Sequence, residues 1–184
     1  MIEFLKKVRV IFSSILYLVM AVLIGGVFFL IGQSVYNSYK EKIYFDNQTR
    51  FDLAVFKDGE NWFTIPSGKT ELKKEFLSKK TLIEIRNGDQ ILESHEIKTQ
   101  TGNTYVYNIL NKSIYYIGQV TYASNDLQFA LKSEQKNERR IEGVFFELFE
   151  VEYVFDAPPS EITVNSNGSS QSARKKYIRR VLRY

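Results

Sequence analysis

Residues 10–32 (VIFSSILYLVMAVLIGGVFFLIG) carry no charged side chain, and this run constrains the fold more than any other feature. A helix of this length rises roughly 34 Å, enough to cross a hydrocarbon core of about 30 Å. The core helix of a soluble protein is usually shorter and keeps a polar stripe. The sequence therefore predicts a transmembrane helix over 10–32.

A cleavable signal peptide is the main alternative for this segment, because Lys6, Lys7 and Arg9 resemble its basic n-region. The apolar run, however, is longer than the usual h-region of about 7–15 residues. No small-x-small cleavage site follows it. We therefore interpret the segment as an uncleaved signal anchor of a single-pass membrane protein.

The charges that flank the run predict its orientation. Residues 1–9 hold three basic side chains against Glu3, whereas Lys40 and Lys42, after the run, are interrupted by Glu41. Basic residues favour the cytoplasmic side of a membrane helix. We expect residues 1–9 to be a short cytoplasmic segment and the rest of the chain to be periplasmic or extracellular.

Small residues on the helix indicate a packing surface. Ala21 and Gly25 are four positions apart, with Gly26 beside them. Small-xxx-small spacing lets a second membrane helix approach closely. The expected partners are the lipid bilayer and other membrane-protein subunits, in a homo- or hetero-oligomer.

Residues 33–46 are predicted to continue the helix as a juxtamembrane stalk. Val35, Tyr39 and Ile43 recur every four residues, which is the spacing of one helical face. Such an apolar stripe needs a partner surface, either on another subunit or on the chain's own domain.

From residue 47 to residue 164 the pattern predicts an all-β antiparallel domain, sandwich-like or barrel-like. Apolar and polar residues alternate over 51–57 (FDLAVFK), and the turn sequences Asp58-Gly59 and Asn87-Gly88 separate extended segments. Short strands divided by such turns are typical of sandwiches and barrels. Within this domain a short charged helix is expected at 71–79, and an exposed loop at 132–140.

Catalytic chemistry finds little support in the sequence. The chain has no cysteine and a single histidine, His95, which lies within an alternating strand pattern. Its aspartates fall singly at turns, without the dense spacing of a calcium loop. We predict no catalytic residue, no metal site and no cofactor, and we interpret His95 as a surface residue of a strand.

Tyrosines form the richest local cluster: Tyr105, Tyr107, Tyr116 and Tyr122 lie in two segments that are expected to form a hairpin. An exposed tyrosine face suits glycan stacking or a protein interface. The alternative is that the same side chains belong to the edge of the core.

The chain ends with a polar segment, 165–173, and a basic one, 174–184. We expect a flexible linker followed by a strand or tail. The acidic residues between 141 and 162 complement the tail, and the predicted strand pair joins Glu147, Glu150 and Glu152 to Arg179, Arg180 and Arg183. The tail is expected either beside 144–155 or on an acidic subunit. Because it is predicted to lie outside the cytoplasm, nucleic acid is not an expected partner.

Together these patterns predict a non-enzymatic accessory or structural subunit of a membrane-associated complex, which presents a small β-domain outside the cytoplasm. The alternative is a membrane-anchored module that binds cell-wall glycan or peptide through the tyrosine-rich face. A tethered hydrolase that uses carboxylates alone is a third hypothesis, with little support.

Overall fold

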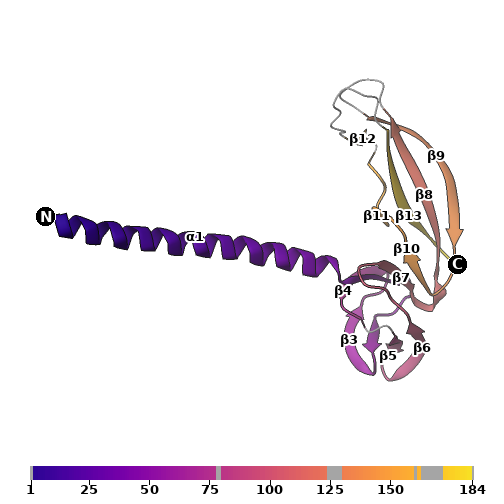
Figure 1. Cartoon of the computed structure of the whole chain (residues 1–184). Helices are drawn as coiled ribbons and strands as arrows, with labels where there is room; N and C mark the ends of the chain where they lie inside the picture. The colour runs from indigo at the N-terminus through magenta and orange to yellow at the C-terminus, as the bar shows by residue number, and fades with distance from the viewer. Residues whose placement is uncertain (1, 78–79, 124–129, 160, 163–171, 184) are drawn as a thin grey trace. The chain divides into compact units, whose positions relative to one another are not determined.

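The computed structural model describes residues 2–77, 80–123, 130–159, 161–162 and 172–183. The chain divides into two compact units, Met1–Lys40 and Glu41–Tyr184. The first unit is the helix α1 and the second is a domain of strands (Figure 1). The predicted fold class, an N-terminal apolar helix followed by a sandwich-like β-domain, is confirmed.

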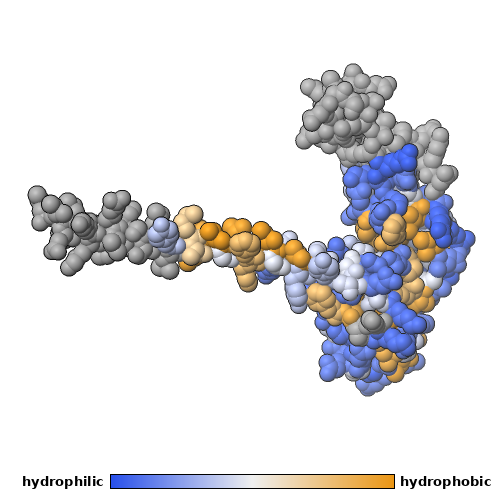
Figure 2. Space-filling view, viewed as in Figure 1, coloured by the Kyte–Doolittle hydropathy of each residue, from blue (hydrophilic) through white to orange (hydrophobic). Residues whose placement is uncertain are grey.

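Helix α1 extends from Ile2 to Ser38. Among the described residues, its part from Val19 to Ser38 is long and apolar enough to cross a membrane, with a mean hydropathy of 2.0. Side chains of this part are exposed, and Figure 2 shows apolar residues along it. An exposed apolar helix near the N-terminus fits a membrane span or a signal anchor.

The predicted stalk over 33–46 is wrong in its second half, because α1 ends at Ser38 and strand β1 covers Glu41–Asn47. The helix closes with a tight turn in which the Tyr39 N–H donates to the carbonyl of Tyr36, at 3.3 Å. Ile43, which matched the helical spacing, lies in the core of the domain. Its true period is two, shared with the buried side chain of Phe45.

Three sheets make up the domain. The first has the order β3 (Glu60–Ile65), β2 (Leu53–Lys57), β5 (Thr81–Asn87), β6 (Gln90–Ile97). The second has the order β10 (Phe145–Leu148), β7 (Thr104–Asn108), β1, β4 (Lys69–Glu75). The third has the order β11 (Tyr153–Val154), β13 (Ser172–Leu182), β8 (Ser113–Ala123), β9 (Ala130–Ile141), β12 (Glu161–Ile162).

Most of the strand pairs are antiparallel, but β1–β7 and β11–β13 are parallel. The described strands do not close into a barrel. A short 3₁₀-helix, η1 (Ile109–Asn111), joins β7 to β8. The hairpin predicted for these two segments is wrong, because β7 pairs with β1 and β10 in the second sheet, whereas β8 pairs with β9 and β13 in the third.

Two segments of the domain differ from prediction. Residues 71–79 were expected to be helical, but β4 occupies Lys69–Glu75 and pairs with β1 along its whole length. The expected loop at 132–140 lies within β9, which pairs with β8. Both segments are highly charged, and both lie next to an apolar or aromatic strand. Tertiary pairing therefore overrides the weak strand propensity of charged residues.

The second sheet is the middle layer of the domain, because each of its faces packs on a different core. Ile43, Phe45 and Tyr107 face the first core, which the first sheet completes. Val106 belongs to the second core, which the third sheet completes. Burial on both faces explains why β7 is buried continuously from Tyr105 onward rather than at alternate positions.

The C-terminal strand β13 pairs antiparallel with β8 along its full length. The Tyr177 ring lies directly over Gly118 of β8, where an added Cβ would be 2.4 Å from ring atoms. The glycine lets the ring cover the strand closely. Most of the predicted linker 165–173 lies outside the described residues, and its last two residues begin β13.

Candidate functional site

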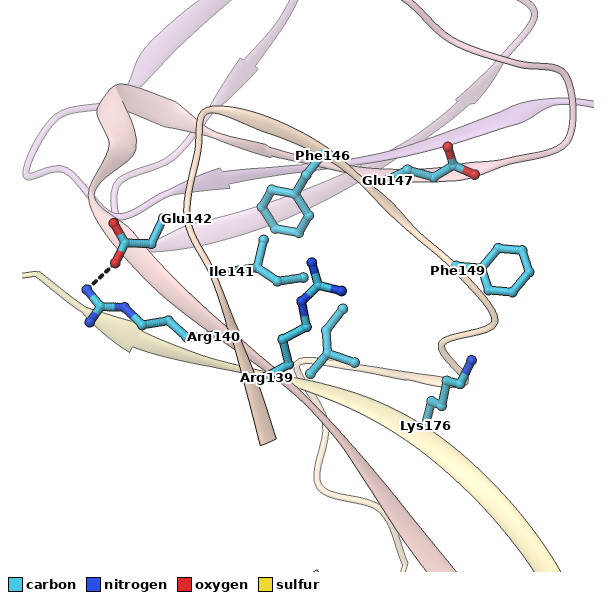
Figure 3. Close-up of a pocket in the computed structure, with 9 residues that line it drawn as sticks. Arg139, Arg140, Ile141, Glu142, Phe146, Glu147, Phe149 and Lys176 are labelled. Carbon is cyan, nitrogen blue, oxygen red and sulfur yellow. Dashed lines mark ion pairs between the residues drawn. The ribbon is translucent and has the colours of Figure 1, made fainter. Parts of the chain in front are cut away.

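A groove in the domain runs along the third sheet and is bounded by the chain around β10. Its volume is about 620 Å³. Figure 3 shows Arg139 extending into the middle of the groove, with Phe146 and Ile141 on one side and Phe149 and Lys176 on the other. The remaining lining residues are Ile117, Arg140, Glu142 and Glu147.

Strand register places these side chains together. Ile117 of β8 is opposite Arg139 of β9 and Ile178 of β13, and Gln119, two residues on, is opposite Lys176. Paired residues share one face of a sheet, as do alternate residues of a strand. A second hollow of about 520 Å³ continues along this face and is lined by Gln119, Glu150, Val151, Glu152, Arg174 and Lys176.

Ion pairs hold in place the segment 149–152, which forms one side of the groove. Lys176 Nζ is 3.0 Å from Glu150 Oε2, and Lys175 Nζ is 2.5 Å from Glu152 Oε2. The Glu152 N–H donates to the Lys176 carbonyl at 3.0 Å. Glu150 has a φ of 55°, which a non-glycine residue rarely adopts. These contacts hold Phe149, 68% exposed, at the groove with Lys176 Nζ 5.2 Å from its ring centroid.

The cations around the groove and the second hollow differ in how they are paired. Arg140 forms an ion pair with Glu142, which also accepts a hydrogen bond from Arg183 at 2.9 Å. Within the described part of the chain, no carboxylate lies within ion-pair distance of Arg139 or Arg174. The groove and the second hollow thus present one free guanidinium group each, Arg139 and Arg174, and these can bind an anion.

On the other face of the third sheet, Glu138 accepts hydrogen bonds from Arg179 at 2.7 and 2.5 Å and from the Tyr177 hydroxyl at 2.9 Å. Hydrogen bonding by Arg179 lowers the pKa of Glu138. Burial, helped by the nearby Glu138, raises the pKa of Tyr177 to about 12. This cluster holds β13 against β9 across β8.

A buried carboxylate, Asp46, joins the second sheet to the third. It accepts hydrogen bonds from Tyr115 at 2.6 Å, Thr70 at 2.9 Å, Gln48 at 2.8 Å and Ser113 at 3.2 Å. Arg180 of β13 completes the set, with Nη1 2.5 Å from Asp46 Oδ1. Burial and the Asp46 charge raise the pKa of Tyr115, which therefore remains a hydrogen-bond donor. The prediction that the aspartates lie at turns is wrong for Asp46, which lies within β1 and bonds to residues of β4, β8 and β13.

The six charged residues of the predicted strand pair lie in one region of the domain, but they do not pair with one another. Arg179 contacts Glu138, Arg180 contacts Asp46, and Arg183 contacts Glu142. The acidic members of the prediction bind elsewhere: Glu150 to Lys176, Glu152 to Lys175, and Glu147 to the Asn103 side chain. The reason is that β13 lies between β8 and β11, and only two of its residues pair with the 144–155 segment.

The tyrosines do not form an exposed platform. Tyr105 and Tyr107 are buried in the first core, where Tyr107 stacks on Phe45 with centroids 5.4 Å apart. Tyr116 is half-buried beneath Arg179, whose guanidinium carbon is 4.4 Å from the ring centroid. Tyr122 is in β8, but its side chain lies outside the described residues. The core interpretation is correct for the first two, since β7 is covered on both faces.

His95 lies on β6, with Nε2 3.4 Å from Glu93 Oε1. The other oxygen of Glu93 accepts a hydrogen bond from the Leu110 N–H at 2.7 Å, where Leu110 has a φ of 54°. Glu93 thus stabilises a strained turn. The His95 side chain is 45% exposed, as the strand pattern predicts. In the described part of the chain, no three His, Asp or Glu side chains group as metal ligands.

On α1, the small residues Ala21, Gly25 and Gly26 are exposed, and open space surrounds the Cβ position of both glycines. Comparisons of the chain with protein-family models, with curated proteins and with solved structures give no match. The function is therefore inferred from the residues of this chain.

Proposed function

We propose that this protein is a non-enzymatic accessory or structural subunit of a membrane-associated complex, anchored by α1 and presenting its β-domain outside the cytoplasm. The main support for the proposal is the short chain segment that connects α1 to the β-domain. Only Tyr39 and Lys40 separate the apolar helix from β1, the strand that enters both cores of the domain.

A connection this short restricts where the domain can be. Three Cα–Cα steps reach at most about 11 Å, so the first strand stays near the end of the anchor. At that end Lys40 Nζ lies 5.4 Å from the ring centroid of Tyr36. Tyrosine and lysine favour the headgroup region, where an apolar body and a polar tip are both satisfied. These features support a domain held at the membrane surface.

The direction of insertion rests on the basic residues Lys6, Lys7 and Arg9. They favour a cytoplasmic N-terminus over the alternative, in which Lys40 and Lys42 would be cytoplasmic. A domain on the other side also fits a chain without cysteine, since its stability needs no disulfide in either redox environment.

Single cysteines test the orientation, because the chain has none of its own. In intact cells, a membrane-impermeant maleimide is expected to label Lys98→Cys, at an exposed position of the domain. Glu3→Cys is expected to react only after permeabilisation. The reverse pattern would contradict the orientation. Mass spectrometry of the membrane fraction supplies the second check, and a mature chain that lacks the apolar run would overturn the anchor.

Assembly through the helix is tested at Gly25. Gly25→Leu places a large side chain on the small-residue surface, whereas Val27→Leu adds bulk on the opposite side of the helix and serves as the control. In mild detergent, we expect the wild type and Val27→Leu to migrate as a complex and Gly25→Leu to migrate as a smaller species. Equal migration of all three would contradict a role for this surface.

The second candidate function, a membrane-anchored ligand-binding module, is favoured by the groove rather than by the tyrosines. Arg139 and Phe149 give this groove a cation and an exposed aromatic ring. Both residue types are enriched at protein interfaces. The two proposed functions are compatible, because the ligand can be a segment of another subunit.

A further inference from the structure

We propose that the groove binds an extended acidic segment of a partner protein, with carboxylates on Arg139 and Arg174 and an apolar side chain between them against Phe149. The proposal deepens the proposed function, on which it rests, by naming the chemistry of the partner that the domain takes.

Free positive charge beside the groove favours an acidic partner. Arg139 lines the groove and Arg174 lines the second hollow, and Lys176 lines both. Neither arginine has a carboxylate partner among the described side chains. The neighbouring cations Arg140 and Lys176 are neutralised by Glu142 and Glu150. A guanidinium group offers a planar fork of donors that matches a carboxylate, and such charge-assisted pairs are among the stronger hydrogen bonds.

The spacing of the two arginines favours an extended segment. Arg139 of β9 is the register partner of Ile117 in β8, and Arg174 of β13 is the register partner of Thr121 in the same strand β8. Four residues of a strand cover about 13 Å. The two arginines lie on opposite sides of β8, so two strand spacings of about 4.8 Å also separate them, and their Cα atoms are roughly 16 Å apart. In an extended peptide, side chains at positions i and i+4 point to the same side about 13 Å apart, and the two long arginine side chains can reach over the remaining few ångströms. The groove therefore fits a segment with acidic residues at i and i+4 and an apolar residue at i+2.

The apolar part of the lining favours an apolar side chain between the two carboxylates. Phe149 is exposed at the groove, and Phe146, Ile141 and Ile117 lie deeper in it. An exposed ring beside a cation is typical of an anchor point in a protein interface. An apolar side chain at i+2 would cover this ring and displace its water.

The same lining argues against a dense polyanion. Glu142, Glu147 and Glu150 lie around the groove among the cations. A polyphosphate chain or an anionic membrane presents closely spaced negative charge, which these carboxylates repel. A peptide with two carboxylates four residues apart can meet the free guanidinium groups and avoid the acids.

The test uses the full-length protein in mild detergent and the rhodamine-labelled peptide Asp-Ser-Leu-Ser-Asp, followed by fluorescence anisotropy. Binding is expected for the wild type and is expected to weaken by about tenfold or more in R139E/R174E. The control R50E/K98E makes the same change of net charge at two exposed positions outside the groove and should bind like the wild type. The peptide Asn-Ser-Leu-Ser-Asn is expected to lose binding.

The proposal is overturned if the wild type does not bind the acidic peptide, or if R139E/R174E with an unchanged circular dichroism spectrum binds it like the wild type. Groove-dependent binding of inorganic polyphosphate or phosphatidylglycerol vesicles, without peptide binding, also overturns it. Cysteine labelling keeps this result separate from the proposed function. An inverted orientation contradicts that function and leaves peptide binding in detergent intact, whereas absent binding with the expected orientation removes the groove proposal alone.

Discussion

Replacing Asp46 by alanine is expected to lower the free energy of unfolding by about 3–5 kcal/mol, the range found when one partner of a buried ion pair is removed. Asp46 is fully buried, and Arg180 is its cationic partner from the C-terminal strand. Without the carboxylate, the hydroxyl groups of Tyr115 and Ser113 also lose their acceptor. Several donors are left unsatisfied at once between the second and third sheets, so the loss is larger than that of an ordinary hydrogen bond.

Urea unfolding of the chain in detergent, followed by circular dichroism, measures this loss. Arg180→Met is expected to cost a similar amount, because it leaves the fully buried Asp46 carboxylate with neutral donors alone. The control is E150Q/E152Q, which removes two exposed ion pairs of β13 and should cost less than about 1 kcal/mol per pair. An Asp46→Ala variant no less stable than this control would show that the buried cluster does not hold the sheets together.

The helix and the local strand signals were predictable because each depends on residues that are close in sequence. The uncharged run predicted α1, and Asp58-Gly59 predicted a turn that the structure forms with φ values of 51° and 88°. A tight hairpin turn needs positive φ at these positions, which Asp and Gly accept at low cost. The stalk prediction was wrong at Ile43 because a spacing of four residues does not distinguish a helix from a strand. Residues four apart also lie on the same face of a strand, whose period is two.

The three-layer arrangement could not be read from such patterns. The alternation of 104–108 places Tyr105 and Tyr107 on one face, but whether that face is covered depends on the first sheet, far away in sequence. The opposite face, with Val106, is covered by the third sheet. Burial of both faces depends on the tertiary structure and not on the local sequence. It makes Tyr105 and Tyr107 core residues instead of an exposed platform.

The groove could not be predicted from the sequence either, because its residues come from distant parts of the chain. Arg139 lies in a segment predicted to be a loop, while Lys176 lies in the predicted tail. Only the register of β8 with both β9 and β13 brings them to one face. Charge complementarity correctly indicated that the basic tail has acidic neighbours, but the choice of each partner depends on strand order.

Ending the chain after residue 171, which removes β13, is expected to unfold the third sheet and leave the first core intact. β13 pairs with β8 along its whole length and supplies Ile178 to the second core. Among the residues that the structure describes, none of those that form the first core belongs to β13. Hydrogen exchange measured by mass spectrometry should show fast exchange in β8 and β9 and continued protection in β2 and β5. A chain that lacks only Tyr184 is the control.

This experiment shows whether the two cores, which share the middle sheet, unfold together or separately. Loss of β13 exposes Val106 and Tyr115, which are fully buried in the intact domain. It also removes the partner of Asp46, so the middle sheet loses packing on one face but keeps Phe45 and Tyr107 packed on the other. If protection in β2 and β5 disappears together with that in β8, the domain is a single cooperative unit, and the C-terminal strand stabilises all three layers at once.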